Sequence, residues 1–357
     1  MRNTATALVD LAAMAHNLQI VRRLCPQGRI MAMLKADAYG HGAVAAARAL
    51  RAADGFAVAR LLEALELREA GVDHRLLLLG TLLDQNDLAL CSRLQIDVTA
   101  HDAGSVAAIS EAARQLPLRV WLKLDSGMHR LGLDPTGFIA AERQLAALPG
   151  VTEVVHMTHF SSTHDLESAV TARQLACFAQ CHAIAPARSV SVANSAALIA
   201  RPELRTGWVR PGIMLYGDNP LAASHPLPLR PVMRLSARVL AIHQLAPGES
   251  VGYDSCWTAE RASRVATVGI GYADGYPRQA PNGTPVWIGG QTVPLAGRVS
   301  MDSITIDVTD GTDVKVSDEA TLWGPELPAA IVAGRVRTAT YALFTGISRR
   351  VTREVVG

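Results

Sequence analysis

Lysine is scarce in this chain. Of its 34 basic residues only three are lysines, Lys35, Lys123 and Lys315, so arginine supplies nearly every solvated cation. An amine can lose its proton where a guanidinium cannot, so a lysine kept in apolar surroundings calls for a chemical explanation. The lysines are therefore the first residues to consider as reactive groups.

Other absences exclude whole classes of protein. Charged residues make up 18% and hydrophobic residues 49%, which excludes disordered, collagen-like and coiled-coil chains. A net charge of +2 offers no basic surface for nucleic acid or anionic lipid. No apolar run reaches about 18 residues and no signal-peptide core follows the N-terminus, so we expect no membrane association or export. Five widely spread cysteines, an odd number, predict free thiols in a cytoplasmic protein.

The pattern of the chain up to residue 230 predicts a barrel. The 357 residues suffice for two or three domains. Short apolar runs alternate with longer amphipathic stretches, as buried parallel strands alternate with their helices. Eight such units fit an α/β fold of the (β/α)8 TIM barrel type, and an open doubly wound sheet is the alternative. The predicted strands are 30–35, 56–59, 76–79, 96–99, 120–124, 154–157, 190–193 and 208–210.

The sequence pattern changes after Pro231. Helical periodicity gives way to β-branched stretches between turn signals, among them Asn282-Gly283, Gly289-Gly290 and Asp310-Gly311. Such pairs tolerate the positive φ that tight hairpins need. We therefore expect a barrel domain over residues 1–230 and a C-terminal, mostly β domain over residues 231–357.

Lys35 is the strongest candidate for a reactive group at the barrel mouth, where the carboxyl ends of the strands meet. It closes the apolar run 30–34 and precedes Ala36-Asp37-Ala38-Tyr39-Gly40. Apolar neighbours lower the pKa of an amine and make it a Schiff-base nucleophile. The alternative is a strand-end lysine that extends to solvent, which the scarcity of lysine disfavours.

A second group at the mouth points to phosphate. Ser195 heads a predicted helix over 195–200, and Gly212-Ile213 follows the eighth strand. Many barrels bind phosphate in these two loops, although Ser195 could equally be an ordinary helix N-cap. Phosphate donors beside a Schiff-base lysine indicate pyridoxal 5′-phosphate (PLP).

Metal sites are not indicated. His156 and His159 are an odd number of residues apart, so on one strand they point to opposite faces and cannot bind one ion. Cys177 and Cys181 lie one helical turn apart without a second pair, which is typical of apolar helix-face residues.

Six motifs occur in order along the chain. They are Ala32-Met33-Leu34-Lys35-Ala36-Asp37-Ala38-Tyr39-Gly40-His41-Gly42, Lys123-Leu124-Asp125-Ser126-Gly127-Met128-His129-Arg130-Leu131-Gly132, Val209-Arg210-Pro211-Gly212-Ile213-Met214-Leu215-Tyr216-Gly217, Val251-Gly252-Tyr253, Gly269-Ile270-Gly271-Tyr272-Ala273-Asp274-Gly275-Tyr276-Pro277-Arg278 and Gly297-Arg298-Val299-Ser300-Met301-Asp302. Through these motifs, and along nearly its whole length, the sequence resembles alanine racemase, a fold-type III PLP enzyme with a (β/α)8 barrel and a C-terminal β domain.

The resemblance implies roles for individual residues. Lys35 would bind PLP as a Schiff base and act as the base for one enantiomer of alanine, while Tyr253 from the partner subunit of a homodimer would be the opposite base. Arg210 would face the pyridine nitrogen and leave it unprotonated. Arg130 and the main chain of the partner subunit's Met301 would bind the substrate carboxylate. The residues implied to hold the phosphate are Tyr39, Ser195, Gly212, Ile213 and Tyr341.

Supporting roles are implied as well. His159 would link Arg210 to the partner's Tyr253, and Lys123 matches a position that orients Arg130, in some members as a carbamate. The partner's Tyr272 and Asp302 would line the substrate entrance. The residues do not distinguish a role in peptidoglycan-precursor synthesis from one in D-alanine breakdown.

Two segments depart from the family pattern. Residues 160–165 read Phe-Ser-Ser-Thr-His-Asp, which differs from the more usual His-Phe-Ala-x-Ala-Asp pattern, and Thr352 stands where proline is expected. Three other functions stay open. One is a racemase of broader substrate range, another a non-catalytic PLP-binding barrel, which would have no C-terminal β domain. The third is a fold-type III decarboxylase, which would set an acidic residue against the pyridine nitrogen in place of Arg210.

Overall fold

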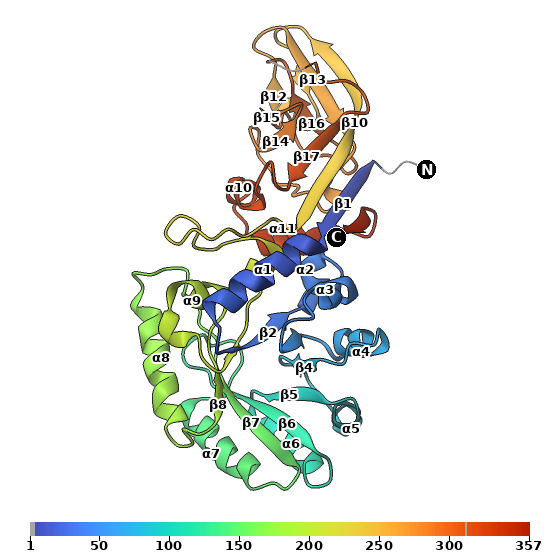
Figure 1. Ribbon diagram of the computed structural model, residues 1–357. Helices are drawn as coiled ribbons and strands as arrows, with labels where there is room; N and C mark the ends of the chain where they lie inside the picture. The colour runs from blue at the N-terminus through green and yellow to red at the C-terminus, as the bar shows by residue number, and fades with distance from the viewer. Residues whose placement is uncertain (1–3, 311–312) are drawn as a thin grey trace.

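The computed structural model describes residues 4–310 and 313–357, which form two parts of different architecture (Figure 1). Gly311 of the predicted Asp310-Gly311 turn lies outside the described residues. In the part of the chain that is described, no helix is both long and apolar enough to cross a membrane.

The larger part is a parallel sheet of eight strands that curves until its edges meet. The strands follow the order β8-β7-β6-β5-β4-β3-β2-β9. Arg210 N donates to Ala193 O over 2.8 Å, and Ser191 Oγ donates to Trp208 O over 2.7 Å, which joins β9 to β8. This order confirms the predicted barrel and excludes the open doubly wound sheet. The strands are β2 (Arg29–Met33), β3 (Gly55–Val58), β4 (Arg75–Leu78), β5 (Ile96–Ala100), β6 (Leu118–Lys123), β7 (Val151–Met157), β8 (Ser189–Ser191) and β9 (Trp208–Val209).

Helices surround this sheet (Figure 1). Asp84, Asp102 and Asp134 each precede a helix and accept the backbone N–H three residues ahead, a cap that stabilises a helix by about 1 kcal/mol. The helix α5 has a polar sequence and buries only Leu88 and Cys91. The helices are α1 (Leu11–Leu24), α2 (Lys35–Gly40), α3 (Ala43–Ala49), α4 (Leu61–Glu69), α5 (Gln85–Arg93), α6 (Ala103–Ala112), α7 (Pro135–Ala146), α8 (Ala169–His182) and α9 (Ser195–Ala200).

The smaller part is built on a second sheet of eight strands. Its long strand β10 pairs with β1, β13 and β17. The two-residue turn Gly289-Gly290 joins β14 to β15 with φ of 59° and 85°, as the hairpin prediction requires. The strands are β1 (Ala5–Asp10), β10 (Met233–Leu245), β13 (Ser263–Val268), β14 (Pro285–Ile288), β15 (Gln291–Pro294), β16 (Ile304–Asp307), β17 (Glu319–Trp323) and β18 (Thr352–Val356), with a separate short pair, β11 (Ser250–Val251) and β12 (Trp257–Thr258).

Two features of this part differ from the sequence expectation. The N-terminal strand β1 pairs with β10 and β18, so residues 5–10 belong by strand pairing to the second sheet and not to the barrel. The cause is the alternating burial of β1, which suits one face of an antiparallel sheet. Two short helices, α10 (Ala329–Arg335) and α11 (Thr340–Gly346), also interrupt the β texture. The division into domains 1–230 and 231–357 stays a proposal, with strand β1 assigned to the second domain instead of the barrel.

Candidate active site

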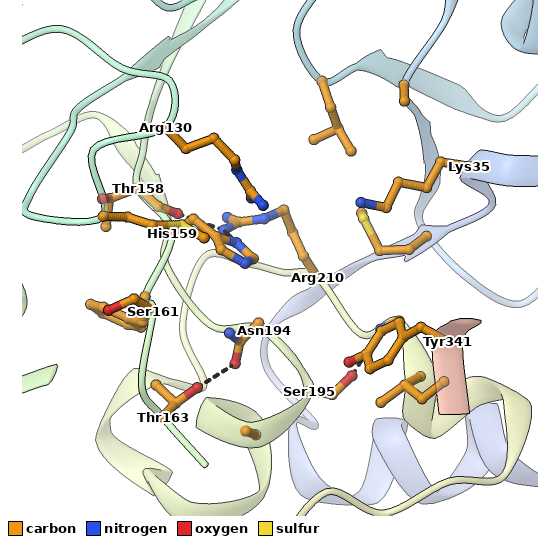
Figure 2. A pocket seen from close by; sticks show the side chains of 18 of the residues that line it. Lys35, Arg130, Thr158, His159, Ser161, Thr163, Asn194, Ser195, Arg210 and Tyr341 are labelled. Atoms are coloured by element: carbon orange, nitrogen blue, oxygen red, sulfur yellow. Dashed lines mark hydrogen bonds between the residues drawn. The ribbon is translucent and has the colours of Figure 1, made fainter. Parts of the chain in front are cut away.

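A cavity of about 700 Å³ opens where the barrel strands end at their carboxyl termini. Figure 2 shows Lys35, Arg130 and Arg210 reaching into it from three sides. The residues that line it, as far as the chain is described, include no aspartate or glutamate, so the cavity suits an anionic ligand. Ten of the fourteen predicted site residues lie here: Lys35, Tyr39, Lys123, Arg130, His159, Ser195, Arg210, Gly212, Ile213 and Tyr341.

An unusual backbone follows Lys35. Ala36, Asp37, Ala38 and Tyr39 all have φ between 51° and 54°, so helix α2 is a left-handed turn built of four successive non-glycine residues. Left-handed helical geometry costs about 1–2 kcal/mol for each L-residue, and such strain persists only where surrounding contacts enforce it. Strand β2 ends at Met33, two residues before the predicted end, and the turn then presents Lys35 at the mouth.

The amine of Lys35 lies in a cationic, half-buried setting. Burial lowers its pKa, the positive charge of Arg130 lowers it further, and the carboxylate of Glu63 acts in the opposite direction. The side chain lines the cavity at the barrel mouth. This placement supports the reading of Lys35 as a nucleophile over the reading of a solvated strand-end lysine.

Arg210 is fixed by contacts to β8 and to the residue that follows β7. It is 4% exposed, and its guanidinium donates to Ser191 O over 2.7 Å and to Thr158 O over 2.6 Å. Burial lowers the pKa of Arg210 to about 10, so the group remains protonated at neutral pH. Its Nη2 lies 3.5 Å from Nδ1 of His159, whose pKa burial and the neighbouring cations lower to about 3. His159 is therefore neutral and can accept from Arg210.

Lys123 ends strand β6 in the same cluster. Burial lowers its pKa to about 8, and the charges of Arg210 and Arg130 contribute in the same direction. Lys123 is thus a buried amine surrounded by other cations, with the negative charge of Asp125 acting against them. That setting favours loss of its proton or a nearby anion.

The other end of the cavity offers uncharged hydrogen-bond donors. Gly212 N–H donates to Ser195 Oγ over 2.9 Å, so the two groups lie side by side at this end. The N-cap of α9 is Asn194, whose side chain accepts from Ala197 N, which corrects the alternative that Ser195 is the cap. A Cβ on Gly212 would lie 2.8 Å from Tyr39 Oη, so only glycine leaves this space open.

Aromatic packing brings the second part of the chain to this end. The ring of Tyr39 lies 4.8 Å from that of Tyr216 and 5.6 Å from that of Tyr341, which belongs to α11. Thr340 Oγ1 donates to Asp218 beside it. Helix α11, which the sequence did not predict, therefore places Tyr341 at the barrel mouth.

The four remaining predicted residues line a different pocket, in the second part of the chain. They are Tyr253, Tyr272, Met301 and Asp302. Tyr253 is 70% exposed and Met301 52% exposed. Within one chain these side chains do not line the cavity that holds Lys35.

Comparison with known proteins agrees with this arrangement. The family model described as alanine racemase, N-terminal domain, matches residues 9–220, and the model for the alanine racemase C-terminal domain matches residues 232–355. The chain belongs to the alanine racemase family. The alanine racemase of Yersinia pestis is 44% identical over 356 residues, 99% of each chain, and the catabolic alanine racemase of Pseudomonas putida is 43% identical over the same share. The crystal structure of biosynthetic alanine racemase from Pseudomonas aeruginosa superposes with a TM-score of 0.96 at 42% identity, covering 100% of both chains.

The two departures from the alanine racemase pattern lie in different places. Phe160, Ser161, Thr163 and His164 line the cavity, so the altered loop contacts the candidate site directly. Thr352 begins β18 and pairs with Thr6 of β1 in the second sheet.

The histidines and cysteines set aside as metal ligands lie apart in the alanine racemase fold. His156 faces outward, with Nε2 3.0 Å from Glu142 and Nδ1 3.0 Å from His182, whereas His159 lines the cavity. Cys181 is buried on α8 and Cys177 packs beside it, as expected of an apolar helix face.

Two contacts at the barrel mouth were not predicted. Thr158 acts through its main-chain oxygen, which has no side-chain signature in a sequence. Asn194 caps α9, where Ser195 was the cap considered from the sequence, and its Oδ1 accepts from Thr163 Oγ1 over 3.0 Å. An asparagine just before a helical run was a usable signal for the cap.

Proposed function

We propose that this chain is a PLP-dependent alanine racemase that interconverts L- and D-alanine by a two-base mechanism. The observation that carries the proposal is the cavity itself. It gathers a lysine of lowered pKa, a fixed arginine and a set of phosphate donors without an acidic residue among the described lining. Family membership over the whole chain supports the same reaction.

The residues present fit PLP. Ser195 Oγ, the Gly212 and Ile213 main chain, and the phenols of Tyr39 and Tyr341 would hold the phosphate, in the space that a Cβ at Gly212 would fill. Lys35 would attach the cofactor. When bound, PLP withdraws electrons from the α-carbon of an attached amino acid and makes its proton acidic.

Arg210, whose guanidinium lies 3.5 Å from His159, would determine how strongly bound PLP withdraws electrons. Arg210 stays charged and does not readily give up a proton, so a ring nitrogen facing it would stay unprotonated. With the ring nitrogen unprotonated, the electron withdrawal by PLP is weaker, which limits side reactions. A decarboxylase would instead need an acid here, and Arg210 supports a racemase over that alternative.

Two bases are needed because inversion removes a proton from one face of the α-carbon and returns one to the other. Lys35 Nζ would serve one face. Tyr253 Oη of a second copy would serve the other, since Tyr253 is exposed and lines a separate pocket in its own chain. We therefore propose a homodimer with shared active sites, which a PLP-binding barrel without the second domain could not form.

The substrate carboxylate would meet Arg130 and the main chain of Met301 from the second copy. Lys123, beside Arg130, would orient it, and Tyr272 and Asp302 of the second copy would line the entrance. Free thiols at all five cysteines support a cytoplasmic location.

A panel of L-amino acids tests the substrate assignment against a broader racemase. We expect kcat/KM for alanine to exceed that for serine or 2-aminobutyrate about 10- to 200-fold, the discrimination one extra group allows in a small pocket. The measurement is incorporation of α-deuterium in D2O together with chiral analysis of the product. Comparable turnover of alanine, serine and lysine would contradict the narrow assignment.

A further inference from the structure

The left-handed turn lies between two residues on which the proposed function depends. Lys35 precedes it and Tyr39 ends it, and both line the cavity. The first glycine comes only after the turn, at Gly40, so none of its four residues relieves the strain by lacking a side chain. Contacts from outside must therefore enforce this conformation.

One side chain from a neighbouring barrel unit binds the start of the turn. Ala36 N–H donates to Oε1 of Glu63 over 2.6 Å. The other oxygen, Oε2, accepts from Ala59 N over 2.8 Å and from Arg60 N over 2.9 Å. Glu63 belongs to α4, which follows β3, the strand paired with β2. A single carboxylate thus ties the residue after Lys35 to the end of the adjacent strand.

The other side-chain hydrogen bonds near the turn differ in kind, and the ring of Tyr39 packs on Tyr216 and Tyr341 only at the far end of the turn. His41 Nδ1 lies 3.0 Å from Ala38 O and 2.9 Å from Tyr39 O, and Asp37 Oδ1 accepts from Ala43 N over 2.7 Å. These bonds join residues 37–43 to one another, so they do not hold the turn in place relative to the barrel. Arg353 donates to Gly40 O from β18, beyond the end of the turn. Glu63 therefore fixes the start of the turn, next to Lys35, relative to the barrel.

We propose that Glu63 is a positioning residue of the racemase, whose carboxylate holds the left-handed turn so that Lys35 and Tyr39 both face the cavity. The inference rests on the proposed function, because it concerns the presentation of the PLP-binding lysine. Glutamine cannot replace the carboxylate. With donors on both oxygens, its amide group would face at least one backbone N–H as donor against donor.

The test compares Glu63→Gln with Glu66→Gln, an exposed glutamate one turn along the same helix. PLP is titrated into each apoprotein, and borohydride then fixes the cofactor bound at Lys35. We expect the dissociation constant for PLP to rise about 10- to 100-fold in Glu63→Gln, the loss of a hydrogen bond to a charged group. In Glu63→Gln the amount of cofactor fixed by borohydride and kcat should both fall, while KM for alanine should change less. Glu66→Gln should match the unchanged protein in all of these measurements.

A rescue experiment separates strain from any other effect of the charge. Ala36 is exposed and has φ 53°, which glycine adopts freely, so Ala36→Gly should recover part of the affinity lost in Glu63→Gln. If Glu63→Gln does not fold, Ala36→Val carries the test, since a β-branched residue opposes the turn directly while Glu63 stays in place.

The outcomes are distinct. Unchanged PLP affinity in Glu63→Gln, or a loss that Ala36→Gly does not reduce, overturns the role of Glu63. Unchanged affinity in Ala36→Val overturns it where that variant is the test. If the unchanged protein itself attaches no PLP at Lys35, the proposed function fails instead.

Discussion

Replacing Lys35 with alanine is expected to give a colourless protein in which borohydride fixes no cofactor. Racemase activity should fall about 10⁴-fold or more, because one change removes both the attachment point and a base. The cavity keeps its other cations and phosphate donors, so PLP should still bind, but reversibly. Absorbance, reduction followed by peptide mapping, and the racemisation rate measure the three consequences.

Lys315→Ala is the matched control for this change. Lys315 lies in the second part of the chain, is exposed and pairs with Asp313 over 2.8 Å, so its loss should leave colour and activity unchanged. A Lys35→Ala protein that stays yellow and can still be labelled on reduction would contradict the Schiff-base assignment.

Replacing Tyr253 with phenylalanine is expected to separate the two enantiomers. Removal of one of two bases should slow α-proton exchange in D2O about 10²- to 10⁴-fold from one enantiomer and much less from the other, whose proton Lys35 takes. The ring stays, so PLP binding and colour should persist. Proton NMR of L-alanine and of D-alanine, each incubated separately, gives the two exchange rates.

Tyr276→Phe controls for the chemical change itself. Tyr276 is buried in the same part of the chain, and its hydroxyl has no hydrogen-bond partner among the described residues. Its removal should therefore leave both exchange rates unchanged. Small and equal effects of Tyr253→Phe on the two enantiomers would count against a two-base scheme.

The local sequence pattern was sufficient to predict most of the barrel and the residues that lie at its mouth. Buried parallel strands are short continuous apolar runs, and all eight were predicted with ends displaced by at most a few residues. Because strand ends of a barrel meet at one face, the residues after them, Lys35, Arg130, His159 and Arg210, could be placed together. The opposite directions of His156 and His159 were also predicted, from the alternation of side chains along a strand.

What sequence reading missed depends on contacts distant in the chain. Nothing in Ala36-Asp37-Ala38-Tyr39 predicts a left-handed turn, because Glu63, 27 residues beyond Ala36, supplies the bond that holds its start. Strand β1 joins its sheet through β10 and β18, more than 200 residues away. Helix α11 is seven residues long, too short for a clear period, and it gains its place by packing on α2.

The division of the fourteen predicted residues between two pockets is the structural basis of the central claim, that two copies of the chain build each active site. Mixing Lys35→Ala with Tyr253→Phe subunits tests it most directly. In a mixed dimer one site carries both changes and the other carries neither. With equal amounts and random exchange, activity should return to about one quarter of the unchanged enzyme, since half the dimers are mixed and each has one intact site. No recovery above the parent variants, once differently tagged subunits are seen to exchange, would contradict the claim.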